Sequence, residues 1–566
     1  MSKRIIECVP NFSEGRDKTV IRQITAAIEA SGGVKLLDVD PGEATNRTVV
    51  TFVGEPEAVV EAAFAGVKRA AELIDMRKHK GAHPRMGATD VLPLIPIAGI
   101  TLAECAELAR GLARRIADEL RIPTYAYEAA AFTPERKNLA ICRAGEYEAL
   151  PEKLARKESA PDFGARPFDE GVARTGATTV GARDFLIAVN FNLNTTSTRR
   201  ANAIAFDVRE KGRPLREGGS PVGKPLRDAA GNPLMQPGTL KATKAIGWFI
   251  EEYGIAQVSM NITDLAVTPL HVAFDEVCRK ADARGVRVTG TEIVGLVPKR
   301  ALIEAGKYFL RKQCRSTGIA EEEIVRIAVK SMGLDDLKPF NPAEKVIEYL
   351  LEAEVQQKQL IDMTCKSFAE ETASESPAPG GGSIAAYMGA LGAALGTMVA
   401  NLSSHKAGWD DRWEEFSNWA EKGQAVLQEL LHLVDEDTAA FNRIMAVFAM
   451  PKSTDEEKAA RSAALQQATL YATEVPLRTM KAASLVFEIV RAMASEGNPN
   501  SVSDAGVGAL AARSAVLGAC LNVKINAAGL KDRAVADVLV AEADALAAEA
   551  RREEAEILKI VESKIG

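Results

Sequence analysis

The chain has 566 residues, too many for one hydrophobic core, and the length suggests about three or four domains. Hydrophobic residues make up 47% of it and charged residues 26%, as in ordinary soluble globular proteins. The formal net charge of −7 gives no support for a polyanionic partner such as nucleic acid. The seven cysteines form no C-x-x-C pair, and the N-terminus lacks the apolar core of a signal peptide. We therefore expect reduced thiols and a cytoplasmic protein.

The first third of the chain alternates strand patterns with helix patterns. Short apolar runs predict strands at 4–9, 34–38, 48–53, 91–95 and 124–127. Helical signals follow Arg16 and Gly54, and a capping box, Thr101-x-x-Glu104, opens a third helix. Strands and helices in this alternation predict an α/β sandwich with ferredoxin-like character, which we place at residues 1–180.

A second α/β sandwich subdomain is predicted for residues 181–334. Its strands at 189–194 and 256–262 alternate apolar and polar residues, so one face of each strand packs inward. The other face carries uncharged polar side chains: Asn190, Asn192, Asn194, Gln257, Ser259 and Asn261. Such a face either stays wet or lines a cleft for a heteroaromatic ligand, and the sequence leaves both open. The Gly/Pro-rich stretch 212–238 is typical of a surface loop or lid.

Strand signals end near Lys338-Pro339, and Ala/Leu/Glu-rich helical pattern continues to the C-terminus. We place a linker at 335–342 and an all-helical domain at 343–566. The stretch 384–402 contains no charged residue and is long enough to raise the question of a membrane span. Its apolar content is mostly Ala and Gly, which also suits close helix packing in a soluble bundle, so we expect a buried helix.

A cationic loop, Lys78 to Asp90, is the first candidate for chemistry. It holds two of the five histidines, His79 and His83, and it is punctuated by Gly81 and Pro84 before an apolar strand. Histidine exchanges protons near neutral pH, which predicts a general acid or base here. A solvated basic loop remains an alternative. The His-x-x-x-His spacing does not favour a metal site, because the loop is not helical and shows no third ligand.

A glycine loop, Ala378-Pro-Gly-Gly-Gly-Ser383, opens a long helix in the C-terminal half, with Ser383 expected as its N-cap. The exposed backbone N–H groups at such an end favour a carboxylate or phosphate. No lysine follows as a Walker motif would require. A flexible hinge explains the loop equally well.

The helix around 427–448 carries a carboxylate on its apolar stripe. The stripe is Leu427, Leu430, Val434, Phe441, Ile444, Met445 and Phe448. Asp437 lies three residues after Val434 and four before Phe441, whereas Asp435 and Glu436 point away from the stripe. A buried carboxyl group has a raised pKa, as a general acid near neutral pH requires. A structural salt bridge to Arg or Lys is the competing account.

Several motifs resemble known families. The segments Cys8–Arg16 (C-V-P-N-F-S-E-G-R), His83–Asp90 (H-P-R-M-G-A-T-D) and Gly181–Asn190 (G-A-R-D-F-L-I-A-V-N) resemble the formiminotransferase family. Ser376–Ser383 (S-P-A-P-G-G-G-S) and Asp437–Phe441 (D-T-A-A-F) resemble the cyclodeaminase/cyclohydrolase family. Joined in this order they resemble the bifunctional formimidoyltransferase-cyclodeaminases. The resemblance implies two steps of histidine degradation: formimino transfer from N-formimino-L-glutamate to tetrahydrofolate, then cyclisation to 5,10-methenyltetrahydrofolate with loss of ammonia.

The resemblance also implies roles for particular residues. The transferase histidine falls on His83, and we expect Asp40, on the loop after the second strand, to orient it. Charge and placement suggest that Arg47, Lys80 and Arg85 bind the glutamate carboxylates. The remaining expected folate or substrate contacts are Asn11, Gly164, Ala165, Arg166, Arg183, Asn190, Gly380, Gly381, Gly382 and Ser383, where 164–171 resembles the family's folate-binding segment. Asp437 would protonate the departing ammonia.

The resemblance further implies polyglutamated tetrahydrofolate as the one-carbon acceptor, no metal, no membrane insertion, and a homo-oligomer formed through the helical domain. Two alternatives remain for the helical half. It could act mainly as a methenyltetrahydrofolate cyclohydrolase, because that relative shares the glycine loop and the aspartate. It could also be only an assembly module.

Overall fold

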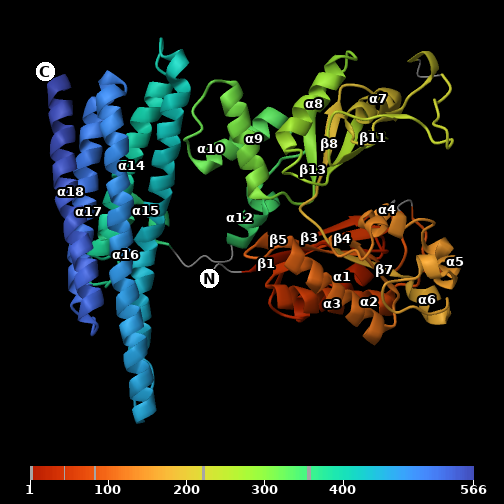
Figure 1. Cartoon of the computed structure of the whole chain (residues 1–566), viewed down its shortest axis with the longest axis horizontal. Helices are drawn as coiled ribbons and strands as arrows, with labels where there is room; N and C mark the ends of the chain where they lie inside the picture. Colours follow the sequence, from red (N-terminus) through yellow and green to blue (C-terminus); the bar gives the residue numbers. More distant parts are fainter. Residues whose placement is uncertain (1–3, 44, 82–83, 220–222, 353–358, 566) are drawn as a thin grey trace. The chain divides into compact units, whose positions relative to one another are not determined.

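The computed structural model describes residues 4–43, 45–81, 84–219, 223–352 and 359–565. It forms two compact units (Figure 1). The first comprises Met1–Ala301 and Met332–Leu351 and contains the sheets; the second comprises Leu302–Ser331 and Glu352–Gly566 and is all helical. The predicted fold class, α/β followed by all-α, is confirmed.

The division at 334 stays a prediction, but the chain does not separate there by packing. Residues 302–331 group with the helical unit. Thr317 N–H donates to Ser417 Oγ at 3.0 Å. A Cβ added at Gly318 would lie 2.2 Å from the carbonyl carbon of Ala420, so the backbones touch. Helix α10 (Glu321–Met332) therefore belongs mostly to the helical unit, although the chain on both sides, up to Ala301 and from Met332 to Leu351, belongs to the first unit.

The first sheet lies in the order β1-β4-β2-β5-β7-β6, with β3 beside β4. Its elements are β1 (Ile5–Cys8), β2 (Asn11–Phe12), α1 (Lys18–Ala30), β3 (Val34–Gly42), β4 (Arg47–Gly54), α2 (Pro56–Leu73), β5 (Thr89–Ala98), α3 (Leu102–Leu120), β6 (Thr124–Glu128) and β7 (Thr178–Ala182). The first part, up to β5, is a β-α-β-β-α-β unit whose strands pair antiparallel, and β7 and β6 extend it in parallel. The capping box Thr101–Glu104 is present as predicted.

Helices α1, α2 and α3 cover one face of this sheet (Figure 1). Strand residues at alternate positions, including Ile6, Cys8, Phe52, Leu92 and Leu94, pack against them and are fully buried. Because side chains alternate across a strand, the residues between them point to the opposite face. That opposite face is where the cavity described below lies.

Short helices fill the segment from β6 to β7. They are η1 (Pro134–Lys137), α4 (Leu139–Cys142), η2 (Tyr147–Ala149), α5 (Leu150–Ala155), η3 (Lys157–Ser159) and α6 (Glu170–Thr175). The segment ends at Gly176, where φ is +69°. A Cβ there would lie 2.2 Å from Met86 O, so only glycine fits.

The second sheet has the order β11-β12-β8-β13, all antiparallel. Its elements are β8 (Ile187–Leu193), α7 (Thr198–Val208), β11 (Thr243–Ile250), β12 (Ile255–Ile262), α8 (Leu270–Asp282) and β13 (Val288–Val294). This β-α-β-β-α-β succession with that strand order is ferredoxin-like. Within the stretch 212–238, β9 (Arg213–Pro214) and β10 (Met235–Gln236) pair as a small ladder, and η4 (Glu217–Gly219) follows β9.

Three of the six polar residues of this face, Asn190, Asn192 and Gln257, are buried, whereas Asn194 and Asn261 are exposed. Asn192 and Gln257 are fully buried, and Gln257 Nε2 donates to Asn192 Oδ1 at 2.8 Å. Asn192 Nδ2 in turn donates to Asp336 Oδ2 at 3.1 Å, and Trp248 Nε1 donates to Gln257 Oε1. Of the two alternatives, a wet face is therefore wrong for these residues. Asn261 alone of the six amide-face residues lines the cavity.

Ten helices follow the second sheet in the described residues: α9 (Lys299–Lys312), α10, α11 (Pro342–Lys345), α12 (Ile347–Glu352), α13 (Cys365–Thr372), α14 (Gly381–Ser404), α15 (Trp413–Phe448), α16 (Asp455–Glu496), α17 (Val502–Ala527) and α18 (Arg533–Ile565). Two 3₁₀ turns, η5 (Leu360–Asp362) and η6 (Asp410–Arg412), flank α13 and α14, and η7 (Pro499–Ser501) leads into α17. The five long helices α14–α18 form the bundle (Figure 1).

Helix α14 is the charge-free stretch. Fourteen of its residues are buried, among them Gly392, where an added Cβ would lie 2.9 Å from Gly508 O of α17. Its small residues therefore let helices approach closely. Two helical segments in the described chain, Gly381–Ser404 and Pro499–Ala527, are long and apolar enough to cross a membrane, and 61% and 50% of their most apolar windows are buried.

Candidate active sites

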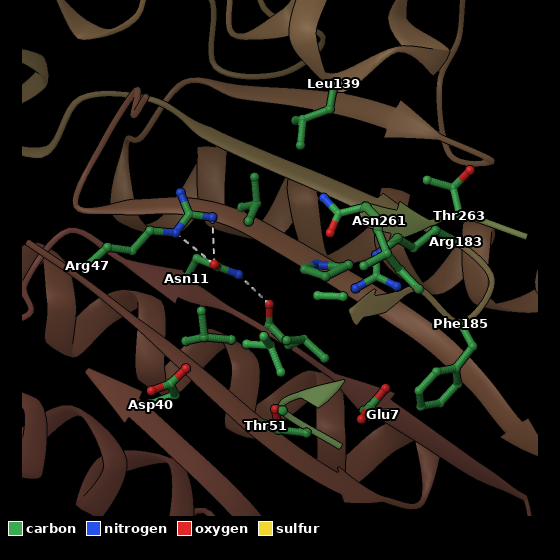
Figure 2. A pocket seen from close by; sticks show the side chains of 18 of the residues that line it. Glu7, Asn11, Asp40, Arg47, Thr51, Leu139, Arg183, Phe185, Asn261 and Thr263 are labelled. Atoms are coloured by element: carbon green, nitrogen blue, oxygen red, sulfur yellow. Dashed lines mark hydrogen bonds between the residues drawn. The ribbon is translucent and has the colours of Figure 1, made fainter. Parts of the chain in front are cut away.

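A cavity of about 590 Å³ lies on the face of the first sheet that α1–α3 leave open (Figure 2). Alternate residues of the strands form one wall: Glu7, Val9, Asn11, Asp38, Asp40, Arg47, Val49, Thr51, Val91, Pro93 and Tyr127. The second subdomain supplies the facing residues: Phe185, Leu186, Ala188, Lys244, Asn261, Thr263 and Val294 to Leu296. Arg143, at the end of α4, and Arg183 also reach it. A cavity of this volume is in the range that holds a small-molecule substrate.

Two arginines share one buried carboxylate in this cavity. Arg47 Nη1 and Arg143 Nη2 each lie 2.8 Å from Asp90 Oδ2, and the Asp90 side chain is 1% exposed. Met86 N–H donates to the other oxygen, Asp90 Oδ1, at 2.9 Å. Burial lowers the pKa of Arg47 to about 10, so the guanidinium stays charged at neutral pH. Two cations against one anion leave net positive charge, which suits the carboxylates of a substrate.

Arg47 is also fixed by an amide. Its Nε donates to Asn11 Oδ1 at 2.8 Å, and Figure 2 shows the two side chains together at one side of the cavity. Asn11 Nδ2 donates to Val9 O, which orients the amide oxygen toward the arginine. The structure thus brings together Asn11 and Arg47, as the sequence predicted, and adds Asp90 and Arg143.

Four carboxylates line the same cavity: Glu7, Asp38, Asp40 and Glu128. Asp40 was expected on a loop, but β3 continues to Gly42, so Asp40 lies within the strand and its exposed side chain points to the cavity. Burial raises the pKa of Asp38. Glu7 on β1 is 2% exposed, and burial raises its pKa to about 7, opposed by the positive charge of Arg183.

His79 anchors the cationic loop, Lys78 to Asp90, to the rest of the α/β unit, which does not support the alternative of a solvated basic loop. His79 is buried, and its Nε2–H donates to Asn46 O at 2.8 Å. Arg85 Nε donates to His79 Nδ1 at 3.4 Å, so the ring is neutral with its proton on Nε2. Burial lowers the pKa of His79, in agreement with a neutral structural role. His83 lies outside the described residues, and its catalytic role stays a prediction.

Two other predicted cationic residues of this loop do not line the cavity. Arg85 lies 2.7 Å from Glu148 Oε1 and 3.1 Å from Glu146 Oε2, so protein carboxylates already occupy its guanidinium. Lys80 is exposed, and its carbonyl accepts from Asn46 Nδ2 at 3.0 Å. Their geometry gives no support for gripping glutamate, which Arg47 and Arg143 are better placed to do.

Of the remaining predicted folate contacts in the α/β unit, Arg183 lines the cavity and the others do not. Arg183 lines the cavity and donates to Asp184 O. Gly164, Ala165 and Arg166 do not line it; Arg166 pairs with Asp169 and donates to Arg121 O at 3.1 Å. Asn190 is buried and donates to Glu292 Oε2 at 3.0 Å, away from the cavity lining.

In the helical unit, the glycine loop holds Asp437. Helix α14 begins at Gly381 with Gly380 as N-cap, so Ser383 is the third helical residue and not the cap as expected. Ser383 N–H and Oγ–H donate to Asp437 Oδ2 at 2.9 and 3.2 Å. A Cβ added at Gly382 would lie 2.0 Å from Asp437 Oδ1, so only glycine lets the carboxyl group approach. The anion at this helix N-terminus is the protein's own aspartate.

The electrostatics of Asp437 suit an acid. Burial raises its pKa, and the two donors of Ser383 oppose this. Within the described residues Asp437 has no ion pair with Arg or Lys, so the salt-bridge account finds no support. Asp435 and Glu436 face elsewhere as predicted: Asp435 Oδ1 accepts from Leu360 N–H, and Glu436 contacts Tyr471 and Arg443.

The apolar stripe of α15 leaves the core after Asp437. Leu430 and Val434 are fully buried, but Phe441, Met445 and Phe448 are 37%, 49% and 53% exposed. The stripe is therefore buried only up to about Asp437, and the end of α15 contributes little to the bundle core. Asp437 thus lies where buried packing gives way to exposed apolar surface.

Sequence reasoning missed Glu7, Arg143 and Lys244. Glu7 carries a signal: it is the one charged residue in an apolar strand, between Ile6 and Cys8. Arg143 and Lys244 carry none, since they reach the cavity from a short helix and from a strand of the other subdomain. In the part of the chain that is described, no group of three or more His, Cys, Asp or Glu side chains is placed to hold a metal.

Three family models match the chain in succession. A formiminotransferase domain, N-terminal subdomain, matches residues 5–183; a formiminotransferase domain matches 188–352; and a formiminotransferase-cyclodeaminase model matches 364–545.

Whole-length and partial relatives agree with these models. The formimidoyltransferase-cyclodeaminase of Rattus norvegicus is 41% identical over 561 residues, 99% of each chain. The glutamate formimidoyltransferase of Streptococcus pyogenes serotype M1 is 42% identical over 54% of this chain and 94% of its own. The methenyltetrahydrofolate cyclohydrolase of Methylorubrum extorquens is 40% identical over 36% of this chain and 98% of its own. The resemblance inferred from the motifs is confirmed, and this chain belongs to the formimidoyltransferase-cyclodeaminase family.

Proposed function

We propose that the chain catalyses two consecutive folate reactions. The α/β unit transfers the formimino group from N-formimino-L-glutamate to N5 of tetrahydrofolate and releases glutamate. The helical unit then closes 5-formiminotetrahydrofolate to 5,10-methenyltetrahydrofolate and releases ammonia. Family membership and the cavity support the first reaction, and the buried carboxyl group of Asp437 supports the second.

The Arg47–Asp90–Arg143 cluster carries the transferase proposal. Its net positive charge meets the two carboxylates of formiminoglutamate, with a guanidinium able to bind a carboxylate through two hydrogen bonds. In the reaction, folate N5 forms a bond to the formimino carbon and loses a proton. The bond from that carbon to the glutamate nitrogen breaks, and this nitrogen gains a proton. We assign both proton transfers to His83, oriented by Asp40.

Asp437 is the proposed acid of ring closure. Folate N10 attacks the formimino carbon, and the formimino nitrogen must be protonated before it leaves as ammonia. A carboxyl group whose pKa is raised by burial keeps its proton nearer neutral pH than an exposed one. The glycines 380–382 and Ser383 hold this carboxyl group, with Gly382 and Ser383 in contact with it.

The test uses the full chain with formiminoglutamate and tetrahydrofolate. Appearance of methenyltetrahydrofolate absorbance together with one ammonia per turnover is the expected result. Absence of glutamate release would contradict the transferase assignment. Release of glutamate without ammonia would contradict the cyclodeaminase assignment.

A cyclohydrolase function of the helical unit is the second candidate, favoured by the similarity to the Methylorubrum extorquens enzyme. It predicts rapid hydrolysis of supplied methenyltetrahydrofolate and slow ammonia release from 5-formiminotetrahydrofolate. A pure assembly module predicts neither reaction, and substitution of Asp437 would then leave both unchanged.

We also propose that the helical unit forms a homo-oligomer. Large apolar side chains are exposed on α14 and α17, which pack together: Leu391, Met398, Leu402, Val507, Leu510, Leu521 and Ile525. Leu521 and Ile525 are 70% and 72% exposed. A group of exposed apolar side chains of this size is typical of a protein–protein interface. Sedimentation of the native chain and of Leu521→Asp tests this: the substitution should dissociate the assembly.

The remaining parts of the proposal concern substrate form and compartment. We propose polyglutamated tetrahydrofolate as the physiological acceptor, catalysis without a metal, no membrane insertion and a cytoplasmic location. The seven cysteines are all unpaired thiols, which supports a reducing compartment. Activity that survives exhaustive chelation, and a lower KM for the polyglutamate than for the monoglutamate, are the expected results.

A further inference from the structure

Glu7 is the most buried of the four carboxylates that line the cavity, since Asp40 is exposed and Asp38 and Glu128 are half-buried. Its neighbours Ile6 and Cys8 pack into the helix-covered core, so its side chain points to the cavity and is 2% exposed. No hydrogen bond or ion pair to its carboxylate occurs among the described residues. Asp90, by contrast, accepts from two arginines and a backbone N–H. A buried carboxylate without donors is unfavourable unless a ligand supplies them.

The surroundings of Glu7 are suited to an uncharged ring. Figure 2 shows Glu7 near Phe185 and Thr51, at the opposite side of the cavity from Arg47 and Asn11. Carboxylates of a substrate would be repelled by Glu7 and attracted by the arginine cluster. The cavity therefore has one side where Arg47 and Arg143 share a carboxylate, and another where the carboxylate of Glu7 has no hydrogen-bond donor and feels only the more distant charge of Arg183.

The pterin ring of tetrahydrofolate has the complementary edge. Its N3–H and 2-amino group point in the same direction and present two parallel donors to the two oxygens of a carboxylate. The protonated formimino group of formiminoglutamate also carries two N–H donors, so the test must separate the two substrates by their KM values.

We propose that Glu7 anchors the N3–H and 2-amino edge of tetrahydrofolate in the transferase cavity and so fixes which way the pterin lies. This rests on the proposed transferase function. The anchor places the pterin at the Glu7 side and leaves the arginine cluster to formiminoglutamate. Glu7 is a binding residue in this assignment and moves no proton in the reaction.

The protonation state of Glu7 matters for the test. Other charged or titratable groups line the cavity with it or act on it electrostatically: Asp38, Asp40, Arg47, Tyr127, Glu128, Arg143, Arg183, Lys244 and Glu348. Only the ionised carboxylate accepts both hydrogen bonds, so the anchor is weaker where Glu7 is protonated.

The experiment is a steady-state transferase assay of the full chain at pH 8, read by glutamate release. The acceptor is tetrahydrofolate or its analogue with a 2-methyl group in place of the 2-amino group. For Glu7→Gln we expect KM for tetrahydrofolate to rise by about 30-fold or more, as for loss of a charge-assisted pair of hydrogen bonds. KM for formiminoglutamate and kcat should change less than about threefold by the same reasoning. The 2-methyl analogue should be a poor acceptor for the native chain and equally poor for Glu7→Gln.

The matched control is Glu128→Gln, which removes one half-buried carboxylate from the same cavity. An equal rise in KM for Glu128→Gln would mean that net charge, not pairing, is responsible, and would overturn the proposal. A fall in kcat at unchanged KM for Glu7→Gln would make Glu7 a proton-transfer group, which also overturns it. No glutamate release by the native chain would instead contradict the proposed function itself.

Two further arms keep the test decisive if Glu7→Gln folds poorly. Ring closure of supplied 5-formiminotetrahydrofolate reports whether the helical unit of the variant is intact. The native chain alone also answers the question, because it must discriminate between tetrahydrofolate and the 2-methyl analogue, and less so at pH 6 than at pH 8. Equal use of both acceptors by the native chain overturns the anchor.

Discussion

The backbone N–H of Ser383 lies 2.9 Å from Oδ2 of Asp437, and the hydroxyl of the same serine lies 3.2 Å from that oxygen. A residue in the first turn of one long helix thus fixes the carboxyl group of another. Burial raises the pKa of Asp437 and the two donors partly offset this. The contact with Ser383 therefore positions the aspartate and partly offsets the effect of burial on its pKa.

Asp437→Asn should abolish ring closure and leave formimino transfer intact. Asparagine keeps the shape and can still accept from Ser383, but it has no proton to give to the departing ammonia, and loss of a general acid typically costs about 10²–10⁴-fold in rate. Ammonia release from supplied 5-formiminotetrahydrofolate measures this. Asp435→Asn, on the other side of α15, is the control, and an equal loss there would remove the distinction drawn from the helix geometry.

The pH profile of ring closure follows from the raised pKa of Asp437. The acid works when protonated, so kcat should fall as pH rises through that pKa. Ser383→Ala removes one donor to the ionised form, which raises the pKa further and should move the falling limb to higher pH. A limb that moves to lower pH would contradict this assignment of the acid.

Gly382→Ala should impair ring closure strongly while transfer is retained. The added Cβ would lie 2.0 Å from Asp437 Oδ1, so the carboxyl group must leave its place against α14. Gly381→Ala is the comparison, since its Cβ would meet only the side chain of Asn522 at 3.6 Å. The loss of kcat should be much smaller for Gly381→Ala, and equal losses would mean that backbone freedom, not the steric contact, is what matters.

Asp437 and its glycine loop could be found from the sequence because both signals are local. The spacing from Val434 and Phe441 placed the aspartate on one face of a helix, and the Gly-Gly-Gly-Ser run marked a helix start. What the sequence could not show is that the two meet: Ser383 and Asp437 are 54 residues apart. Nor could it show that the last turns of α15 lie outside the bundle core and leave Phe441 exposed.

For the α/β unit, the arrangement of strands and helices in layers could be predicted from the sequence. Alternation of strands and helices predicted the sandwich, and the amide-bearing strands were correctly found. A cleft between the two α/β subdomains was predicted, but most of its lining was not, because the walls come from strands of two sheets and Arg143 comes from the end of a four-residue helix without periodicity. The cationic loop misled for a related reason: Arg85 pairs with Glu146 and Glu148, which lie over 60 residues later.

Asp90→Asn should destabilise the chain. Without the carboxylate, Arg47 and Arg143 remain buried as two like charges near each other, and breaking such a buried pair costs about 3–5 kcal/mol. Urea unfolding followed by circular dichroism measures the loss. Glu152→Gln, at an ion pair with Arg156 whose side chains are 75% and 68% exposed, is the control and should change the unfolding free energy by less than about 1 kcal/mol.

Glu7→Gln should stabilise the folded chain at pH 8 and have little effect at pH 5. Burial raises the pKa of Glu7 from 4.5 to about 7, so the folded chain holds a proton that the unfolded chain has lost between those values. Ionisation of Glu7 therefore lowers the unfolding free energy progressively as pH rises from about 4.5 to 7, by up to about 3 kcal/mol. Glutamine removes this penalty, so the difference in unfolding free energy between variant and native chain should grow over that window and then level off. Thermal unfolding at pH 5, 6, 7 and 8 measures it. A difference in unfolding free energy that does not depend on pH would mean that the pKa of Glu7 is the same in the folded and unfolded chain. Burial of Glu7 without hydrogen-bond donors would then carry no cost.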